Sequence, residues 1–382
     1  MPKHFEKQLQ LIIVVVTFGL ATDFGVCTCD KISNQCFGQD SQAQTTSDET
    51  SYQELSSLQG LPSRIAFGSC GHQDKPQPIL DQVIAAKSDL FIYLGDNIYG
   101  DTRDMQVLKS KYDKLGAKPE FQRLRRHCPV LAIWDNHDYG ENDAGNEYPM
   151  KRESREIFLD FWRVPIDDAQ RQNEGIYGVH RFKSNAFTMQ VILLDTRFFR
   201  DSLKRNPRPL PQNSPFKNEY QPLEDPQATL LGEAQWKWLA NVFAEPADLR
   251  VICSSIQFGH EYNGWESWTN LPLEQQKMLD LIQEHQAHGV VFISGDVHWG
   301  EISHREIEGL YPIYDITASG ITETWPTIEP NKYRVGEPVR ENHFGMIEIN
   351  WDETDPSVTF KLIDVTGKLR EAKSIKLSDL RL

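Results

Sequence analysis

Between residues 64 and 295, short apolar runs of strand length alternate with segments in which apolar residues recur at helical spacing. The strands predicted in this part are Arg64–Ser69, Leu90–Gly95, Val130–Trp134, Gly175–Phe182, Phe187–Asp195, Leu249–Gln257 and Gly289–Gly295. The predicted helices are Pro78–Lys87, Asp104–Leu115, Pro119–His127, Ser154–Trp162, Gly232–Phe243 and Leu273–His285.

After residue 300 the pattern becomes mostly strand-like. Further strands are predicted at Leu310–Thr317, His343–Trp351, Val358–Val365 and Ser374–Leu377. Alternating strands and helices followed by a strand-rich end predict an α/β fold, in which helices flank two stacked sheets. Ligand sites in such sheets gather beyond the carboxyl ends of the strands. Polar side chains that follow a strand are therefore the first candidates for a functional site.

One long segment interrupts the alternation. Residues Arg200 to Gln227 hold five prolines between Pro207 and Pro222 and a sixth at Pro226. Loops of this length are usually either functional, for example as lids, or disordered. The sequence favours neither interpretation.

Residues 1–26 are typical of a secretory signal peptide. Lys3 and Lys7 precede an apolar stretch from Leu9 to Ala21 that is too short to span a bilayer comfortably. An uncleaved anchor is the alternative. Residues 27–60 are rich in Ser, Gln, Thr and Asp and predict a flexible leader. The catalytic domain is expected over residues 61–382, in a secreted or otherwise extracytoplasmic (periplasmic or extracellular) protein.

The six cysteines fall into different settings. Cys27, Cys29 and Cys36 lie in the leader, where an oxidising compartment favours one local disulfide whose pairing the sequence leaves open. Cys128 and Cys253 lie beside or within apolar strand-like runs, so we expect buried packing residues there.

The formal charge is 40 − 55 = −15, and it is spread along the chain. Such a surface repels nucleic acid and anionic membranes, so we expect neither as a stable partner. A small anionic substrate is compatible with this charge if bound cations invert the local field.

Three apolar runs end in side chains that commonly bind metals. Carboxylates brought together at one sheet edge would repel each other unless cations lay among them, so the pattern predicts a metal centre. The three runs are Phe91–Tyr99, Leu131–Asp138 and Val290–His298.

Each run contributes different ligands. Asp96 has two carboxylate oxygens and suits a position between two cations, and Tyr99 follows it by three residues, so that a turn returns its phenol. Asn136 is expected to supply an amide oxygen. Asp296 and His298 are two residues apart, which places both side chains on the same side of an extended backbone.

The three residues Asn136, His137 and Asp138 are expected to have different roles. Successive side chains of an extended backbone point to opposite faces, so the three cannot all bind the same ion. We expect His137 to face the substrate as a proton donor or charge stabiliser, and Asp138 to orient the His137 ring.

Other strand ends supply further candidates. Cys70 is either inert or disulfide-bonded, or it joins the ligands as a thiolate that favours iron. Arg197 is expected to bind a substrate phosphate through its planar guanidinium, with a surface salt bridge as the alternative. Gln257 and, just after it, His260 are candidates for a metal ligand or a substrate contact.

Five motifs occur in order: Phe67-Gly-Ser-Cys70, Gly95-Asp-Asn-Ile-Tyr99, Trp134-Asp-Asn-His-Asp138, Leu194-Asp-Thr-Arg197 and Ser294-Gly-Asp-Val-His298. Over roughly residues 64–321 the chain resembles the PhoD-like alkaline phosphatases, a branch of the calcineurin-like metallophosphoesterases. The resemblance implies a four-layer α/β sandwich. It also implies Fe(III) held by Cys70, Asp96, Tyr99 and His298, and Ca(II) held by Asp96, Asn136 and Asp296.

The chain departs from many of these relatives in one motif. It reads Asp-Asn-His-Asp over residues 135–138, where they read Asp-Asp-His-Glu. A changed ligand alters which cation binds, so Mn(II), Mg(II) and Zn(II) are alternatives for the second metal.

These residues predict hydrolysis of a small phosphate ester, either a phosphomonoester or a phosphodiester. Two cations roughly 3.5–4 Å apart would hold a hydroxide that attacks phosphorus. Two alternatives come from other classes: a mononuclear iron oxidase or oxygenase, and a catalytically inactive secreted protein that binds metal or phosphate. The sequence gives no prediction of oligomeric state.

Overall fold

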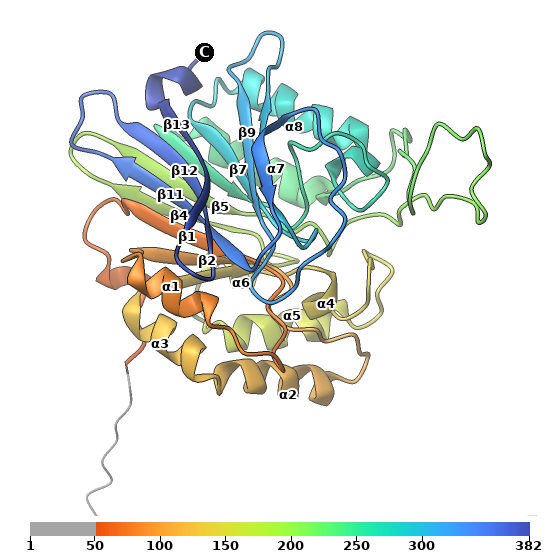
Figure 1. Ribbon diagram of the computed structural model, residues 1–382, viewed down its shortest axis with the longest axis horizontal. Coiled ribbons are helices and arrows are strands. Elements are labelled where there is room, and N and C mark those ends of the chain that lie inside the picture. The colour runs from red at the N-terminus through yellow and green to blue at the C-terminus, as the bar shows by residue number, and fades with distance from the viewer. Residues whose placement is uncertain (1–50) are drawn as a thin grey trace, which may run out of the picture. The chain divides into compact units, whose positions relative to one another are not determined.

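The computed structural model describes residues 51–382. Its helices are α1 (Ile79–Ala85), α2 (Met105–Gly116), α3 (Pro119–His127), α4 (Asn136–Tyr139), α5 (Lys151–Phe161), α6 (Ala169–Gln172), α7 (Gly232–Ala244) and α8 (Pro272–Glu284), with short 3-10 turns η1 (Leu55–Ser57), η2 (Trp268–Asn270) and η3 (Leu377–Leu380). Helices α1, α2, α3 and α5 form one outer layer, and α7 and α8 lie on the opposite side of two central sheets (Figure 1). The described residues therefore form the predicted layered α/β fold.

The first sheet combines a parallel part with an antiparallel part. Its order is β13 (Leu369–Lys376), β12 (Ser357–Asp364), β11 (His343–Asn350), β1 (Arg64–Gly68), β2 (Leu90–Leu94) and β3 (Val130–Ile133). Strands β1, β2 and β3 are parallel to one another, and β11 runs antiparallel to β1. The carboxyl ends of β1, β2 and β3 consequently lie at one edge of this sheet.

The second sheet has the order β10 (Arg334–Val339), β8 (Gly300–Arg305), β9 (Ile313–Ala318), β7 (Val290–Ser294), β6 (Leu249–Cys253), β5 (Thr188–Leu193) and β4 (Gly178–Lys183). Strands β5, β6, β7 and β9 are parallel. The sheets pack against each other, since the ring centroids of Tyr314 on β9 and Phe360 on β12 are 5.4 Å apart.

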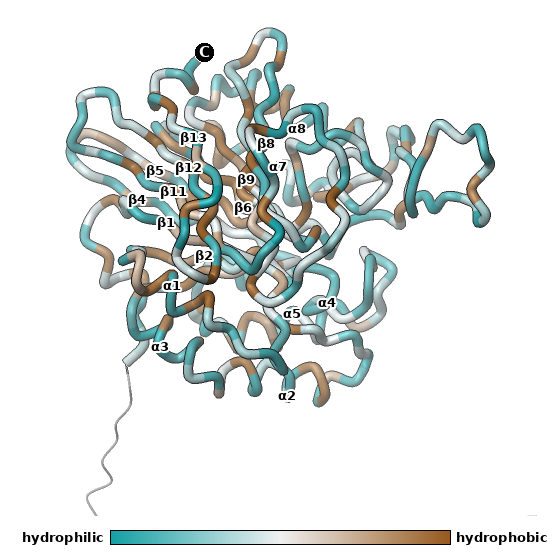
Figure 2. The backbone as a smooth tube through the Cα atoms, in the orientation of Figure 1, coloured by the Kyte–Doolittle hydropathy of each residue, from teal (hydrophilic) through white to brown (hydrophobic). Residues whose placement is uncertain are grey.

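The burial of each strand explains its sequence. Every residue of β2, β6 and β7 is buried, because these strands are covered on both faces, and all their residues are apolar except Arg250 on β6, Ser294 on β7 and the phenol of Tyr93 on β2. Strand β12 alternates buried and partly exposed residues, as expected for a strand with one solvated face. Hydrophobic segments accordingly concentrate in the central strands (Figure 2).

Two strands were missed by the sequence analysis, and a third was predicted too short. Strand β8 reads Gly-Glu-Ile-Ser-His-Arg and β10 reads Arg-Val-Gly-Glu-Pro-Val, so neither contains an apolar run. Strand β13 begins at Leu369 rather than Ser374; its first residues are mostly polar and exposed, so the apolar pattern did not reveal them. These strands are stabilised by pairing with neighbours, a contribution that local sequence does not carry.

The described end of the predicted leader contacts the domain. The backbone N–H of Gln53 donates to the carbonyl oxygen of Arg125 at 2.8 Å, and the Arg125 guanidinium lies 4.9 Å from the Tyr52 ring centroid. Residues 51–60 thus pack against the domain. The predicted signal peptide and Cys27, Cys29 and Cys36 lie outside the described residues. Within residues 51–382, no helix combines the length and apolar character needed to cross a membrane.

The loop from residue 200 to 227 contains no regular helix or strand in the described structure. Its middle projects from the domain as the green segment on the right (Figure 1). An isolated antiparallel β-bridge between Arg205 and Tyr220 pairs the two halves of the loop. Tyr220 is buried and lines the pocket described below.

Candidate metal centre

The backbone turns sharply where the candidate ligands follow their strands. Cys70, Asp96, Asp296 and His298 all have positive φ angles, of 61°, 50°, 72° and 64°. Such angles cost energy for residues other than glycine and cluster at functional sites. Asp296 and His298 are therefore not on the extended backbone that the sequence analysis assumed.

Two glycines allow the strand ends to meet. A Cβ atom on Gly95, at φ 99°, would lie 2.5 Å from the Asp135 Cβ, so β2 and β3 approach closely only because residue 95 is glycine. A Cβ atom on Gly295 would lie 2.3 Å from the Ser69 hydroxyl oxygen. This second contact joins the two sheets and places Cys70 beside Asp296, whose carbonyl oxygen is 3.7 Å from the Cys70 sulfur.

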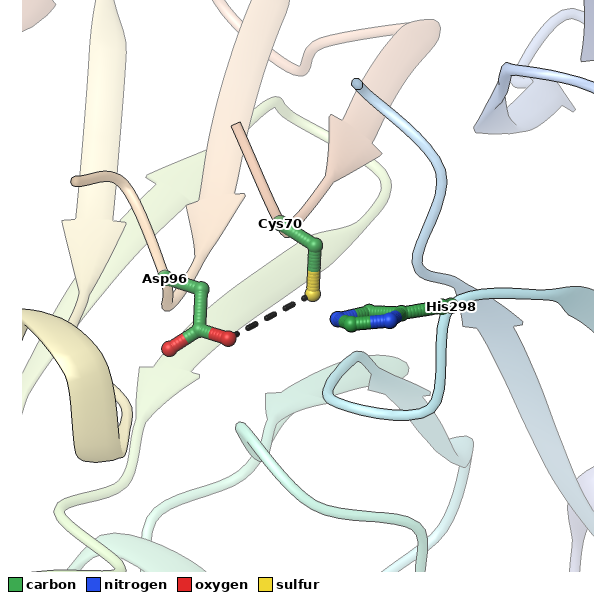
Figure 3. Close-up of side chains that lie close together, drawn as sticks. All are labelled: Cys70, Asp96 and His298. Atoms are coloured by element: carbon green, nitrogen blue, oxygen red, sulfur yellow. Dashed lines mark hydrogen bonds between the residues drawn. The ribbon is translucent and has the colours of Figure 1, made fainter. Parts of the chain in front are cut away.

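Three potential ligands converge from different strand ends. One ligand atom from each of Cys70, Asp96 and His298 lies within 4.8 Å of the others, and the Cys70 sulfur is 3.6 Å from an Asp96 carboxylate oxygen (Figure 3). Donors held about 2.0–2.3 Å from one ion are separated by distances up to about this size. The three side chains thus fit a single cation.

Tyr99 lies at the same place. Its phenolic oxygen is 3.3 Å from the His298 Nε2 atom. The Tyr99 ring packs between His72 and His137, with centroid separations of 4.8 and 4.2 Å, and this packing fixes the direction of the phenol. Sulfur, phenol, imidazole and carboxylate together form a set that suits iron.

Oxygen donors lie on the other side of Asp96. Asp96, Asn136 and Asp296 line one pocket. The Asn136 amide nitrogen donates to Asn142 at 3.1 Å, whereas its amide oxygen is buried without a protein partner. A buried acceptor without a donor is costly, and a cation would satisfy it. These three residues fit a second, oxygen-bound cation.

Burial makes this cluster of acidic groups electrostatically costly in the absence of cations. Burial and the neighbouring Asp135 carboxylate raise the pKa of Asp96 to about 6. Burial raises the pKa of Asp296 well above its usual value, with further contributions from Asp135 and Glu266. Burial and Asp96 also raise the pKa of the Cys70 thiol. Bound cations reverse these effects by stabilising the ionised forms.

His137 lies on the single helical turn α4, not on an extended strand. Its backbone N–H donates to an Asp96 carboxylate oxygen at 3.2 Å, and its ring Nδ1 contacts the Asp101 carboxylate at 2.7 Å. Burial alone would lower the pKa of His137, but the Asp96 and Asp101 carboxylates raise it to about 9. The ring lines the same pocket as Asp96.

The expectation that Asp138 orients His137 is wrong. Because the backbone is helical here, the Asp138 carboxylate turns back and accepts hydrogen bonds from the backbone N–H groups of Asp135 and Asn97. Asp138 therefore fixes the turn and the loop after β2. Asp101 is the residue that holds the His137 ring.

The expectation that Arg197 binds substrate is also wrong. Arg197 is completely buried, and its Nε atom donates to Asp135 at 2.6 Å. One terminal nitrogen donates to Glu266 at 2.7 Å, and the other donates to Asp135. Every nitrogen of the guanidinium is thus engaged by protein carboxylates. Arg197 neutralises charge beneath the pocket.

Gln257 does not reach the pocket either. It is fully buried, and its amide nitrogen donates to Glu301 at 2.8 Å and to Thr317 at 3.0 Å. The His260 Nε2 atom lies 3.5 Å from the same Glu301 carboxylate. These side chains belong to a polar network inside the second sheet, so the assignment of Gln257 as a substrate contact is corrected.

Other residues of the site were missed by the sequence analysis. Asp135 stands inside a motif that was singled out, but no pattern distinguished it from its neighbours. Asp101 does not follow a predicted strand, so no sequence pattern marked it as a site residue. The pocket wall contains aromatic side chains from distant loops, which only the folded chain brings together: Tyr220, Trp265, Trp299 and Trp325.

Cys70, Cys128 and Cys253 are buried free cysteines. The prediction that Cys128 and Cys253 are packing residues is confirmed. Cys70 is not disulfide-bonded, which leaves its sulfur available as a ligand.

Comparisons with known proteins identify the family and the fold of the chain. The sequence profile of the PhoD-like phosphatases matches residues 65–327. Alkaline phosphatase D of Bacillus subtilis (strain 168) is 24% identical over 283 residues, which is 64% of this chain and 47% of that protein. The chain therefore spans about half the length of this relative.

Solved structures show the same fold. A structure of PhoD has a TM-score of 0.58 at 18% identity, covering 82% of this chain and 72% of that one. The Plasmodium protein GAP50, described as the anchor in the inner membrane complex, has a TM-score of 0.51 at 12% identity, covering 82% and 89%. Because the family profile covers most of the chain, the protein belongs to the PhoD-like phosphatase family.

Proposed function

We propose that this protein is a secreted, metal-dependent hydrolase of phosphate esters. The observation that carries the proposal is the convergence of Cys70, Asp96 and His298 at one point, beside a pocket lined by Asn136 and Asp296. Membership of the PhoD-like phosphatase family supports the same chemistry.

The ligand set favours two different cations. Cys70, Asp96, Tyr99 and His298 would hold Fe(III) through sulfur, carboxylate, phenol and imidazole. Asn136 and Asp296 complete an oxygen-rich site for Ca(II), and Mn(II), Mg(II) or Zn(II) are alternatives there. When bound, the cations supply activation of the attacking water and stabilisation of charge on the phosphoryl oxygens.

His137 supplies the proton chemistry. Its Nδ1 is held by Asp101, so its other ring nitrogen is left to meet the substrate in the pocket. A protonated imidazole at this position donates its proton to the departing alcohol oxygen. Arg197 acts only indirectly, by balancing the charges of Asp135 and Glu266.

Hydrolysis of p-nitrophenyl phosphate and bis(p-nitrophenyl) phosphate tests the proposal, with elemental analysis of the same preparation. Activity is expected to disappear when a chelator removes the cations and to return when they are restored. The variant His137→Ala is expected to keep the metals but to hydrolyse a substrate with a poor leaving group roughly 10²–10⁴-fold more slowly. Full metal occupancy without turnover of either ester would contradict the proposal.

Export is supported by the composition of the first residues. Lys3 and Lys7 before the apolar residues 9–21 are typical of a signal peptide. N-terminal sequencing of protein recovered from the medium or periplasm should begin near residue 27. Retention of residues 1–26 in the mature protein would favour the uncleaved anchor instead.

A further inference from the structure

The pocket above the candidate ligands has an unusual composition for a phosphate-binding site. Among its lining residues in the described structure there is no lysine and no arginine. The phosphate charge therefore has to be met by the cations and His137. Beyond these groups the wall is made of amide, carboxylate and aromatic side chains: Asn142, Asp143, Glu219, Tyr220, Trp265, Glu266, Trp299 and Trp325.

The carboxylates of this wall differ in how they are neutralised. Glu266 pairs with Arg197 at 2.7 Å and with Arg200 at 3.2 Å, beneath the pocket. Glu219 pairs with Arg205 at 3.0 Å, on the exposed side of the loop, and with Arg208. Both carboxylates are therefore balanced by positive charge.

Asp143 forms no close side-chain ion pair in the described structure, although the Arg200 guanidinium donates to its backbone carbonyl oxygen. Burial and the neighbouring Glu266 raise the pKa of the Asp143 carboxyl, and a bound cation would favour its ionised form. The Asp143 side chain is 19% exposed, and the cation nearest to its carboxylate in the described structure is Arg205, at the limiting distance of 4.0 Å. It accepts a hydrogen bond from the Tyr220 hydroxyl, which keeps the carboxylate in the pocket wall. A poorly compensated, largely buried carboxylate attracts a cationic ligand.

Aromatic side chains line the same pocket as Asp143. Trp325 is 47% exposed, and its ring centroid is 6.3 Å from that of His298. The Trp265 indole N–H donates to Glu329 at 3.2 Å, which holds that ring in place. The electron-rich face of tryptophan binds alkylammonium groups, and a nearby carboxylate strengthens this binding. A further anionic group would instead meet Asp143 unfavourably.

We propose that the outer part of this pocket binds a positively charged alcohol, so that the preferred substrates are phosphate esters of small ammonium-bearing alcohols. The pocket volume of about 230 Å³ suits a small alcohol, because pockets that bind drug-sized ligands measure roughly 300–1,000 Å³. This inference rests on the proposed hydrolase function and names the substrate class of the same site. Asp143 is its charge partner, and Trp325 and Trp265 are its aromatic walls.

Two chromogenic diesters of equal shape isolate the charge. One is the p-nitrophenyl phosphodiester of choline, and the other is the p-nitrophenyl phosphodiester of 3,3-dimethylbutan-1-ol, in which carbon replaces the charged nitrogen. In both, water adds to phosphorus, the bond to the p-nitrophenyl oxygen breaks, and p-nitrophenolate leaves. We expect kcat/KM to be at least about tenfold higher for the choline diester. Equal values would overturn the inference.

Variants identify the residues that recognise the charge. Asp143→Asn keeps the shape and the positive φ of 53°, which asparagine tolerates, and Trp325→Leu removes one aromatic face. In each variant, the ratio of kcat/KM for the choline diester to kcat/KM for the uncharged diester should fall close to one. The metal content should stay unchanged. Trp238→Leu, a half-buried tryptophan on α7, is the matched control and should keep the preference. If Asp143→Asn lost metal, Asp143 would be a metal ligand and the inference would be wrong.

Binding gives a second readout that does not depend on turnover. Choline chloride titrated into the full chain should change tryptophan fluorescence saturably, whereas 3,3-dimethylbutan-1-ol at the same concentrations should have a much weaker effect. A response to both compounds alike would contradict charge recognition. Absence of hydrolysis of either diester, with choline still bound, would instead reject the proposed hydrolase function and keep the cation site.

Discussion

The ends of β1, β2 and β7 differ from the ends of β5 and β6. Both groups of strands carry polar side chains just beyond their carboxyl ends, and both were predicted to build the site. Cys70 lies beside Asp96, and Asp96 and Asp296 line the pocket, whereas Arg197 and Gln257 are buried in ion pairs and hydrogen bonds. Position after a strand is therefore not sufficient to make a ligand.

The two groups of residues differ in whether oppositely charged side chains of the protein neutralise them. Arg197 has Asp135 and Glu266 within reach, so its guanidinium is satisfied by the protein itself. In the described structure no lysine or arginine forms an ion pair with Asp96 or Asp296, and the Asn136 amide oxygen has no hydrogen-bond partner, so bound cations would make their burial tolerable. Polar residues of the first kind should control stability, and those of the second kind should control metal binding and turnover.

The largest effect is expected from Asp96→Asn. This change removes the negative charge shared by both proposed cations, so metal content should fall and kcat/KM should drop on the order of 10³-fold or more. Elemental analysis and hydrolysis of bis(p-nitrophenyl) phosphate measure the two outcomes. Asp113→Asn, on the exposed surface of α2, is the control. Full activity of Asp96→Asn would place the chemistry elsewhere.

Arg197→Met should act on stability. Removing the guanidinium leaves Asp135 and Glu266 buried without their countercharge, and breaking such a pair costs about 3–5 kcal/mol of unfolding free energy. Urea denaturation measures this loss. Arg103→Met breaks an exposed pair with Glu141 and should cost less than about 1 kcal/mol. An Arg197 variant of native stability with a raised KM would restore the substrate-binding role.

The protonation of buried His343 tests whether polar residues outside the site control the stability of the protein. Burial lowers the pKa of His343 from 6.5 to about 4. Between these values the unfolded chain binds a proton that the folded chain does not, so stability is lost as the pH falls. Between pH 7 and pH 5, the free energy of unfolding of the unmodified protein should fall by about 2 kcal/mol more than that of His343→Gln. Urea midpoints of the two proteins at both pH values measure this, and parallel changes would disprove it.

The smallest effect is expected from Asp101→Asn. This change weakens the hydrogen bond that orients His137, and kcat should fall about tenfold with metal content unchanged. Asp138→Asn is the informative contrast, because Asp138 binds backbone N–H groups and should lower stability more than turnover. A larger catalytic loss for Asp138→Asn at native stability would return the orienting role to Asp138.

The sequence predicted the layered fold because buried strands and amphipathic helices carry strong local patterns. It predicted Cys70, Asp96 and Tyr99 as candidate ligands because their motifs follow such strands, and the structure brings these side chains together. It failed for Asp138 because four residues of helix at Asn136–Tyr139 are too short to give a helical period.

Other features of the site were beyond any local pattern. The partners of Arg197 lie 62 and 69 residues away in the chain, so their countercharge was invisible before folding. The same holds for Trp265 and Trp325, which reach the pocket from separate loops. Strands β8 and β10 were missed because pairing, and not apolar sequence, defines them.

The central claim is that Cys70, Asp96, Tyr99 and His298 bind one iron ion. The visible absorption spectrum of the purified protein, taken with its iron content, tests this claim most directly. We expect a charge-transfer band from the Tyr99 phenolate to Fe(III), and the loss of this band in Tyr99→Phe. A protein without iron, or a band that survives in Tyr99→Phe, would contradict the claim.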